Sequence, residues 1–143
     1  MKLKVAWIAP YNCKTLSHRF TQSLDGSSHS ASWIRNGAMA LAQSNEVELH
    51  ILTQDKRLLK DYDFLEDGIH FHFFKNAYRH IPRPILFYQL DRNKFYERLK
   101  QINPDIVHGH GTENLFSYIA VTSGFPNVIS IQAIVTKLFK QHQ

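Results

Sequence analysis

Short apolar strands alternate with helical segments along this chain, and this order restricts the fold more than any other feature. Residues 2–9 (KLKVAWIA) alternate basic and apolar side chains and then become wholly apolar, which is typical of a strand in a sheet covered on both faces. In residues 32–42, small and apolar side chains recur every four positions and predict a helix that packs closely on that sheet. Residues 46–53 (EVELHILT) alternate again and predict the second strand.

A third strand and a second helix are expected in the middle of the chain. Residues 69–74 (IHFHFF) alternate, which places His70 and His72 on one, more polar, face of the strand. After two prolines, residues 85–102 carry apolar side chains at helical spacing, and Pro104 is expected to end this helix.

The remaining part of the chain repeats the order strand, helix, strand. Residues 105–108 (DIVH) and 127–131 (NVISI) predict strands, and the helix between them is expected to be N-capped by Thr112 and to stop near Gly124. Strands and helices alternating at this spacing predict a three-layer α/β/α sandwich with a mainly parallel, Rossmann-like sheet. We expect residues 1–143 to form one such domain.

Composition is typical of a globular, soluble chain. Hydrophobic residues make up 43% and charged residues 20%, so enough apolar surface is available to offset the entropy of ordering the backbone. The apolar run at the N-terminus is shorter than the roughly 20 residues that span a bilayer, and it lacks a signal-peptide cleavage site. Cys13 is the single cysteine, and we expect it to be a surface thiol. These features predict a cytoplasmic chain whose net charge of +5 favours an anionic partner.

The connection spanning residues 10–31 is the first candidate site, because a connection of about twenty residues is long for a compact domain. The free N–H groups of the helix that follows are a suitable seat for phosphate. Ordinary N-capping by one serine is the open alternative. The glycine-rich dinucleotide fingerprint is absent, which disfavours NAD. The candidate binding residues at the end of this connection are Gly26, Ser27, Ser28, His29 and Ser30.

The sequence DIVHGHGT, residues 105–112, is the second candidate site. A strand that ends in histidine and glycine lets a ligand approach the backbone, while His110 projects into the crevice at the carboxyl end of the sheet. Gly111 and Thr112 are expected to line the same rim, and Gln132 to reach it from the end of the last strand. Local hydrogen bonding by His110 is the alternative.

Metal binding is the other chemistry that paired imidazoles suggest. The HGH and HFH sequences place imidazoles two residues apart on one face of a strand. Zinc needs three or four ligands, and no cysteine or acidic cluster accompanies either pair in the sequence. We therefore expect no metal and no other cofactor.

Four segments together resemble the N-terminal, glycosyl transferase 4-like domain of retaining glycosyltransferases of the GT-B fold. They are MKLKVAWIAPY, SHSASWIRNGAMALAQSNEVELHILT, INPDIVHGHG and NVISIQAI, and they occur in that order over nearly the whole chain. The resemblance implies a two-domain enzyme in which this half binds a glycan or lipid-linked acceptor and a C-terminal half binds the nucleotide-sugar donor. It also implies metal-independent hexosyl transfer, as in polysaccharide biosynthesis.

The resemblance assigns roles to the two candidate sites. His110 matches the second histidine of the family's DxVHxH pattern, which faces the cleft near the transferred sugar and its phosphate, and this makes it the candidate catalytic residue. Residues 26–30 match a loop near the phosphates or acceptor, although Ser27 and Ser28 stand where glycines are common. Ala133 likewise replaces a frequent glycine. Because the sequence stops at Gln143, we expect a truncated domain that is inactive alone.

Two further interpretations follow from charge and size. Basic side chains of the second helix are expected either to contact an anionic membrane at the inner face of the cell or to form a solvated face; they are Arg92, Lys94, Arg98 and Lys100. The alternative function is a stand-alone, non-catalytic module that binds a phosphorylated or anionic ligand. Nucleic acid is not an expected partner, because no stacking platform or known nucleic-acid motif accompanies the charge.

Overall fold

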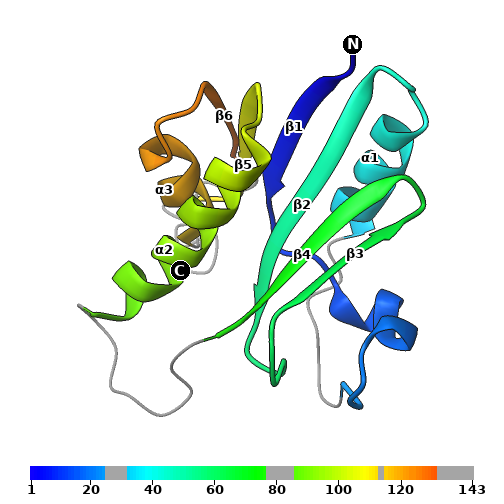
Figure 1. Ribbon diagram of the computed structural model, residues 1–143, viewed down its shortest axis with the longest axis vertical. Coiled ribbons are helices and arrows are strands. Elements are labelled where there is room, and N and C mark those ends of the chain that lie inside the picture. Colours follow the sequence, from blue (N-terminus) through cyan, green and yellow to red (C-terminus); the bar gives the residue numbers. More distant parts are fainter. Residues whose placement is uncertain (25–31, 77–85, 113–114, 132–143) are drawn as a thin grey trace, which may run out of the picture.

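A six-stranded sheet with helices on both faces forms the protein (Figure 1). The computed structural model describes residues 1–24, 32–76, 86–112 and 115–131. The elements are β1 (Leu3–Ile8), the 3₁₀ helix η1 (Cys13–Arg19), α1 (Ser32–Ala42), β2 (Val47–Asp55), β3 (Tyr62–Glu66), β4 (Ile69–Lys75), α2 (Leu86–Ile102), β5 (Ile106–His110), α3 (Leu115–Thr122) and β6 (Asn127–Ser130).

The strand order is β3-β4-β2-β1-β5-β6, and all neighbours are parallel except β3 and β4. This confirms the prediction of an α/β sandwich with a mainly parallel sheet. The antiparallel edge strand β3 was not predicted. It joins β4 through Asp67 and Gly68, whose φ angles of 51° and 76° are those of a two-residue hairpin turn.

One face of the sheet is covered by α1. Its Ile34 and Ala38 are buried in a cluster with apolar side chains of β1, β2 and β4. Gly37 lets the helix lie close to the sheet, because a Cβ atom there would lie 3.3 Å from Cη2 of Trp7. The predicted stripe of small residues is therefore the packing surface of this helix.

The opposite face is covered by α2 and α3. Phe95 and Leu99 of α2 and Ile119 of α3 are fully buried against apolar side chains of β1 and β5. Both helices end where their sequences predict: Asn103, after α2, and Gly124, after α3, adopt positive φ angles that continue neither helix.

The connection after β1 is partly helical. The 3₁₀ helix η1 occupies Cys13–Arg19, and Asn12 caps it by accepting a hydrogen bond from the backbone N–H of Lys14. The prediction of a surface thiol is wrong: Cys13 is fully buried, because η1 folds it against the cluster under α1. Burial and the neighbouring Asp55 carboxylate raise the pKa of this thiol.

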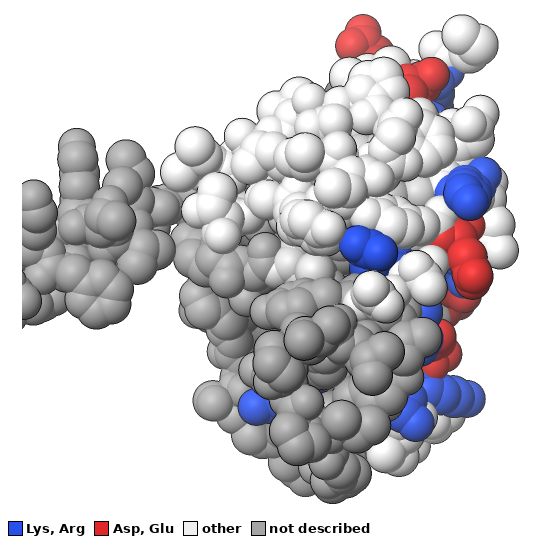
Figure 2. Space-filling view, turned by 90° about the vertical axis from the view of Figure 1, so that its left-hand side faces the viewer, with Lys and Arg blue, Asp and Glu red and all other residues white. Residues whose placement is uncertain are grey.

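Charged side chains of α2 pair with acidic residues of the β3 region. Lys94 contacts both oxygens of Asp61, at 3.0 and 3.1 Å, and Arg98 forms a two-pronged pair with Asp63. Figure 2, seen from the side of α3 and β6, shows positive and negative side chains interleaved along one margin and a largely uncharged surface elsewhere among the described residues. These ion pairs reduce the positive charge that α2 presents to solvent. The predicted contact between α2 and an anionic membrane stays a prediction. None of the helices in the described ranges has the length and apolar character that a bilayer crossing requires.

Candidate functional site

The carboxyl end of β5 carries the candidate catalytic histidine. His110 is the last residue of β5, which lies between β1 and β6. Because α1 connects the parallel neighbours β1 and β2, it runs opposite to the strands and begins at the same edge of the sheet. Trp7 links these features, since it packs against Gly37 of α1 and against the His110 ring.

Two neighbouring rings pack against His110. Its side chain faces the α1 side of the sheet, with the ring centroid 4.5 Å from that of Trp7 and 3.9 Å from that of His108. The residue is 7% exposed. Its Nε2 atom is buried and has no hydrogen-bond partner among the residues that the structure describes. A buried ring nitrogen without a partner is costly, and it is the kind of group that a bound ligand satisfies.

The electrostatic surroundings keep the His110 ring neutral. Burial, followed by the adjacent His108 ring, lowers the pKa of His110 from 6.5 to about 4. Burial also lowers the pKa of His108. At neutral pH the imidazole of His110 is therefore uncharged, and it can donate one N–H and accept at the other nitrogen. This arrangement favours a fixed hydrogen-bonding role over a cationic one.

His108 has a partner that the sequence did not reveal. Its Nε2 lies 2.6 Å from Oγ of Ser130, the last residue of β6. Ser130 pairs in register with His110 across the two parallel strands, so it lies on the same face of the sheet. His108 therefore has a hydrogen-bond partner within the protein. Ser130 is a site residue that only the strand pairing identifies.

Gly111 turns the chain out of the sheet beside His110. Its φ angle of 84° is in the left-handed region that favours glycine. Its N–H donates to the carbonyl of Ser130 at 2.9 Å, and its own carbonyl accepts from the Ser117 hydroxyl. Thr112 is exposed directly after this turn. The residues between Thr112 and Leu115 lie outside the described part, so the N-cap role of Thr112 stays a prediction.

The other predicted site residues lie outside the described ranges. They are Gly26, Ser27, Ser28, His29, Ser30 and Gln132. The structure therefore brings together His110, Gly111 and Thr112 of the predicted set, and it adds Trp7, His108 and Ser130 as their neighbours. Glu48, His50 and His70, on the opposite face, are the one group in the described residues whose ligand atoms are close enough to hold a metal ion.

Comparison with known families agrees with this architecture. The family model described as glycosyl transferase 4-like matches residues 23–143, which include β5, its histidines and most of the sheet. A search of curated proteins found no match. Since the family match covers most of the sequence, the chain belongs to the glycosyl transferase 4-like family.

Proposed function

We propose that this domain forms the acceptor-binding side of a retaining glycosyltransferase that moves a hexose from a nucleotide-sugar donor to a glycan or lipid-linked acceptor. Family membership supports the glycosyltransferase-type function. The acceptor side is proposed from the resemblance of the four sequence segments, in which a second domain supplies the donor site.

The observation that carries this proposal is the state of His110. The ring is buried, neutral and packed against Trp7 and His108, and its Nε2 has no partner among the described residues. It lies at the carboxyl edge of a parallel sheet, where ligands of this class of fold bind. Because the ring is already fixed in position, no free energy is spent on reorienting it when a ligand binds.

In the proposed mechanism, His110 hydrogen-bonds the transferred sugar or an oxygen that gains charge as the phosphate leaves. The low pKa of His110 means that it acts as a neutral donor, so it stabilises developing charge without adding a full positive charge. Gly111 turns the chain out of the sheet beside His110 through its positive φ angle. The proposal assigns no base and no metal to this edge.

The test compares the complete gene product with its His110→Ala variant. Nucleoside diphosphate release from UDP-, GDP- and ADP-linked hexoses would be measured with candidate glycan and lipid-linked acceptors. Loss of one preorganised donor is expected to lower kcat by about 10²–10³. The matched control is Gln101→Ala, because Gln101 is exposed near the end of α2 and lies outside both candidate sites.

Unchanged turnover in His110→Ala would remove the proposed role of His110. Saturable binding of a nucleotide sugar or phosphorylated ligand without turnover, in the complete gene product, would instead favour the non-catalytic module. An equal loss of activity in Gln101→Ala would show that the effect of His110→Ala is not specific to the site.

A further inference from the structure

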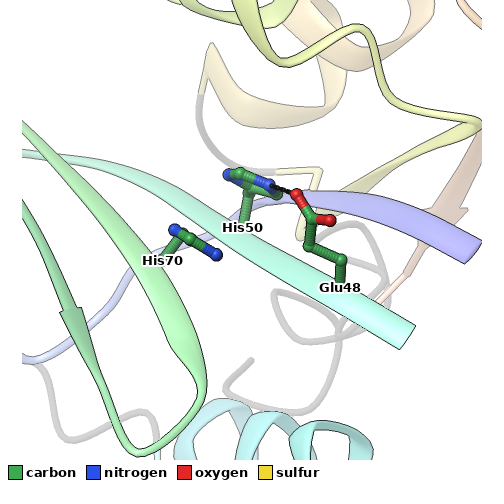
Figure 3. A group of neighbouring side chains, drawn as sticks. All are labelled: Glu48, His50 and His70. Carbon is green, nitrogen blue, oxygen red and sulfur yellow. Dashed lines mark hydrogen bonds and ion pairs between the residues drawn. The ribbon is translucent and has the colours of Figure 1, made fainter. Parts of the chain in front are cut away.

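We propose that Glu48, His50 and His70 form a zinc-binding site on the sheet face opposite His110. Glu48 and His50 belong to β2 and His70 to β4, and the register pairs His50 with His70 (Figure 3). One ligand atom from each of the three side chains lies within 4.8 Å of the other two. Two imidazoles and a carboxylate are a ligand set that zinc commonly uses.

The distances are close to those that zinc requires. Nε2 of His50 lies 3.0 Å from Oε1 of Glu48. In tetrahedral coordination with bonds of about 2.0 Å, two ligand atoms lie roughly 3.3 Å apart. Glu48 and His50 are therefore almost in place. The His70 ring is half-buried and stacked on His50 with centroids 4.5 Å apart, so its plane has to turn about the side-chain bonds for its nitrogen to face the same ion.

A second layer of groups holds His50 in the orientation that a ligand needs. Nδ1 of His50 lies 3.0 Å from Nε2 of His72, and Nδ1 of His72 lies 2.7 Å from Oδ1 of Asp63. Metal-bound histidines usually pass their other N–H to such a partner. In this protein the imidazole of His72 lies between His50 and the carboxylate of Asp63. Both terminal nitrogens of Arg98 donate to that carboxylate.

This chain of contacts accommodates a metal without leaving a ring nitrogen unpaired. With zinc on Nε2 of His50, its Nδ1–H donates to His72, whose Nδ1–H donates to Asp63. Without zinc, Nε2–H of His50 donates to Glu48, Nε2–H of His72 donates to His50, and Arg98, 2.9 Å from Nδ1 of His72, donates to that nitrogen. Both arrangements use two neutral imidazoles, so metal binding needs a change of tautomer, and in the metal-bound form Arg98 donates to Asp63 alone.

Lys4 is the one cation among the described residues within 4 Å of the Glu48 carboxylate. Its Nζ lies 3.9 Å from Oε1 of Glu48 and 3.0 Å from the carbonyl of Ile102. The side chain of Lys4 is 34% exposed, so its ammonium group can move into solvent when zinc binds beside Glu48. Three protein ligands leave the fourth zinc position to water.

The experiment titrates the chain, freed of metal with EDTA, with Zn²⁺ in a calorimeter and by competition with a chromophoric chelator. We expect one tight equivalent. Loss of partners around a zinc ligand costs about 10–100-fold in affinity, so loss of a ligand itself in His70→Ala or Glu48→Gln is expected to cost at least about 100-fold. Asp63→Asn, which alters the second layer, is expected to cost about 10–100-fold.

His18→Ala is the matched control, because it removes an exposed histidine elsewhere and should keep the wild-type affinity. Circular dichroism and the thermal midpoint of each metal-free variant verify that it is folded, and Glu48→Gln keeps the side-chain size should His70→Ala perturb the sheet. Absence of a saturable Zn²⁺ equivalent in the wild type would overturn the proposal. So would wild-type affinity in both His70→Ala and Glu48→Gln, since the metal would then be bound elsewhere.

Discussion

His108 and His110 stack with their ring centroids 3.9 Å apart on the same face of β5. Burial lowers the pKa of both rings, and the adjacent His108 ring lowers the pKa of His110 further. Protonation of either ring is therefore less favourable in the folded chain than in the unfolded chain. Protonation of both rings at acidic pH would place two like charges in contact inside the protein.

Stability should therefore fall with acidification, in part through His110. A histidine with a folded pKa of about 4 and an ordinary value of 6.5 binds its proton more readily in the unfolded chain. Its contribution is fully present above pH 6.5 and is lost as the pH falls toward 4. Over that window one such group contributes a slope of up to about 1.4 kcal/mol per pH unit.

The measurement is the free energy of unfolding in urea, with EDTA present, for the wild type and His110→Gln between pH 4.5 and 8. The wild-type slope should exceed the variant's slope below pH 6.5, and above pH 7 the difference between the two proteins should be constant. Parallel curves across the whole range would contradict a lowered pKa for His110.

Cys13 should be protected from modification in the folded protein. The side chain is fully buried, and burial raises the pKa of its thiol, so the reactive thiolate is scarce. At pH 8 we expect Ellman's reagent to react about 100-fold or more slowly with the native chain than with the chain in guanidinium chloride, because reaction requires opening. Equal rates would show that η1 does not cover this residue.

The sequence was sufficient for the parts of the fold that depend on local periodicity. Alternation in β1, β2 and β4 and the four-residue spacing in α1 identify these elements and their order. Strand β3 was missed although the Asp67–Gly68 hairpin signal is present, because β3 is an edge strand whose alternation is weak: Leu65 faces solvent at 56% exposure. An edge strand that is only partly buried shows weak alternation of apolar and polar residues in its sequence.

Side-chain clusters that depend on strand pairing could not be predicted. His50 and His70 are twenty positions apart, and they become neighbours only because β2 and β4 pair in one particular register. Ser130 reaches His108 for the same reason, through the pairing of β5 with β6. Glu48 joins the two histidines only through this pairing, since no local spacing connects an acid on β2 with a histidine on β4.

Replacing Arg98 should weaken the attachment of α2 to the edge of the sheet. Its guanidinium pairs with both oxygens of Asp63, and the two side chains are 25% and 46% exposed. We expect Arg98→Met to lower the free energy of unfolding by about 0.5–1 kcal/mol at low salt. The difference should shrink in 1 M NaCl, where the screening length is about 3 Å.

The control is Lys100→Met, since Lys100 is an exposed cation on the same helix. Urea unfolding of the three proteins at low and high salt measures both effects. If Arg98→Met were no less stable than Lys100→Met at low salt, the pair with Asp63 would contribute nothing to holding α2 in place.

Gly109 controls how closely α3 packs on β5. A Cβ atom at residue 109 would lie 2.9 Å from Cβ of Ala120, 2.9 Å from Cδ1 of Ile129 and 3.0 Å from Cα of Ser117. The last of these is backbone, so the helix itself must shift. Gly109→Ala is expected to lower the free energy of unfolding by about 1–3 kcal/mol, as overpacking of a dense core does.

Gly37→Ala is the matched control, because its new Cβ would meet only the ring of Trp7, at 3.3 Å, and alanine favours the helix by up to about 1 kcal/mol. We expect its stability to stay within about 1 kcal/mol of the wild type. Urea unfolding followed by circular dichroism compares the three proteins. Wild-type stability in Gly109→Ala would mean that α3 lies farther from β5 than described, and the packing of α3 on the sheet face opposite His110 would have to be revised.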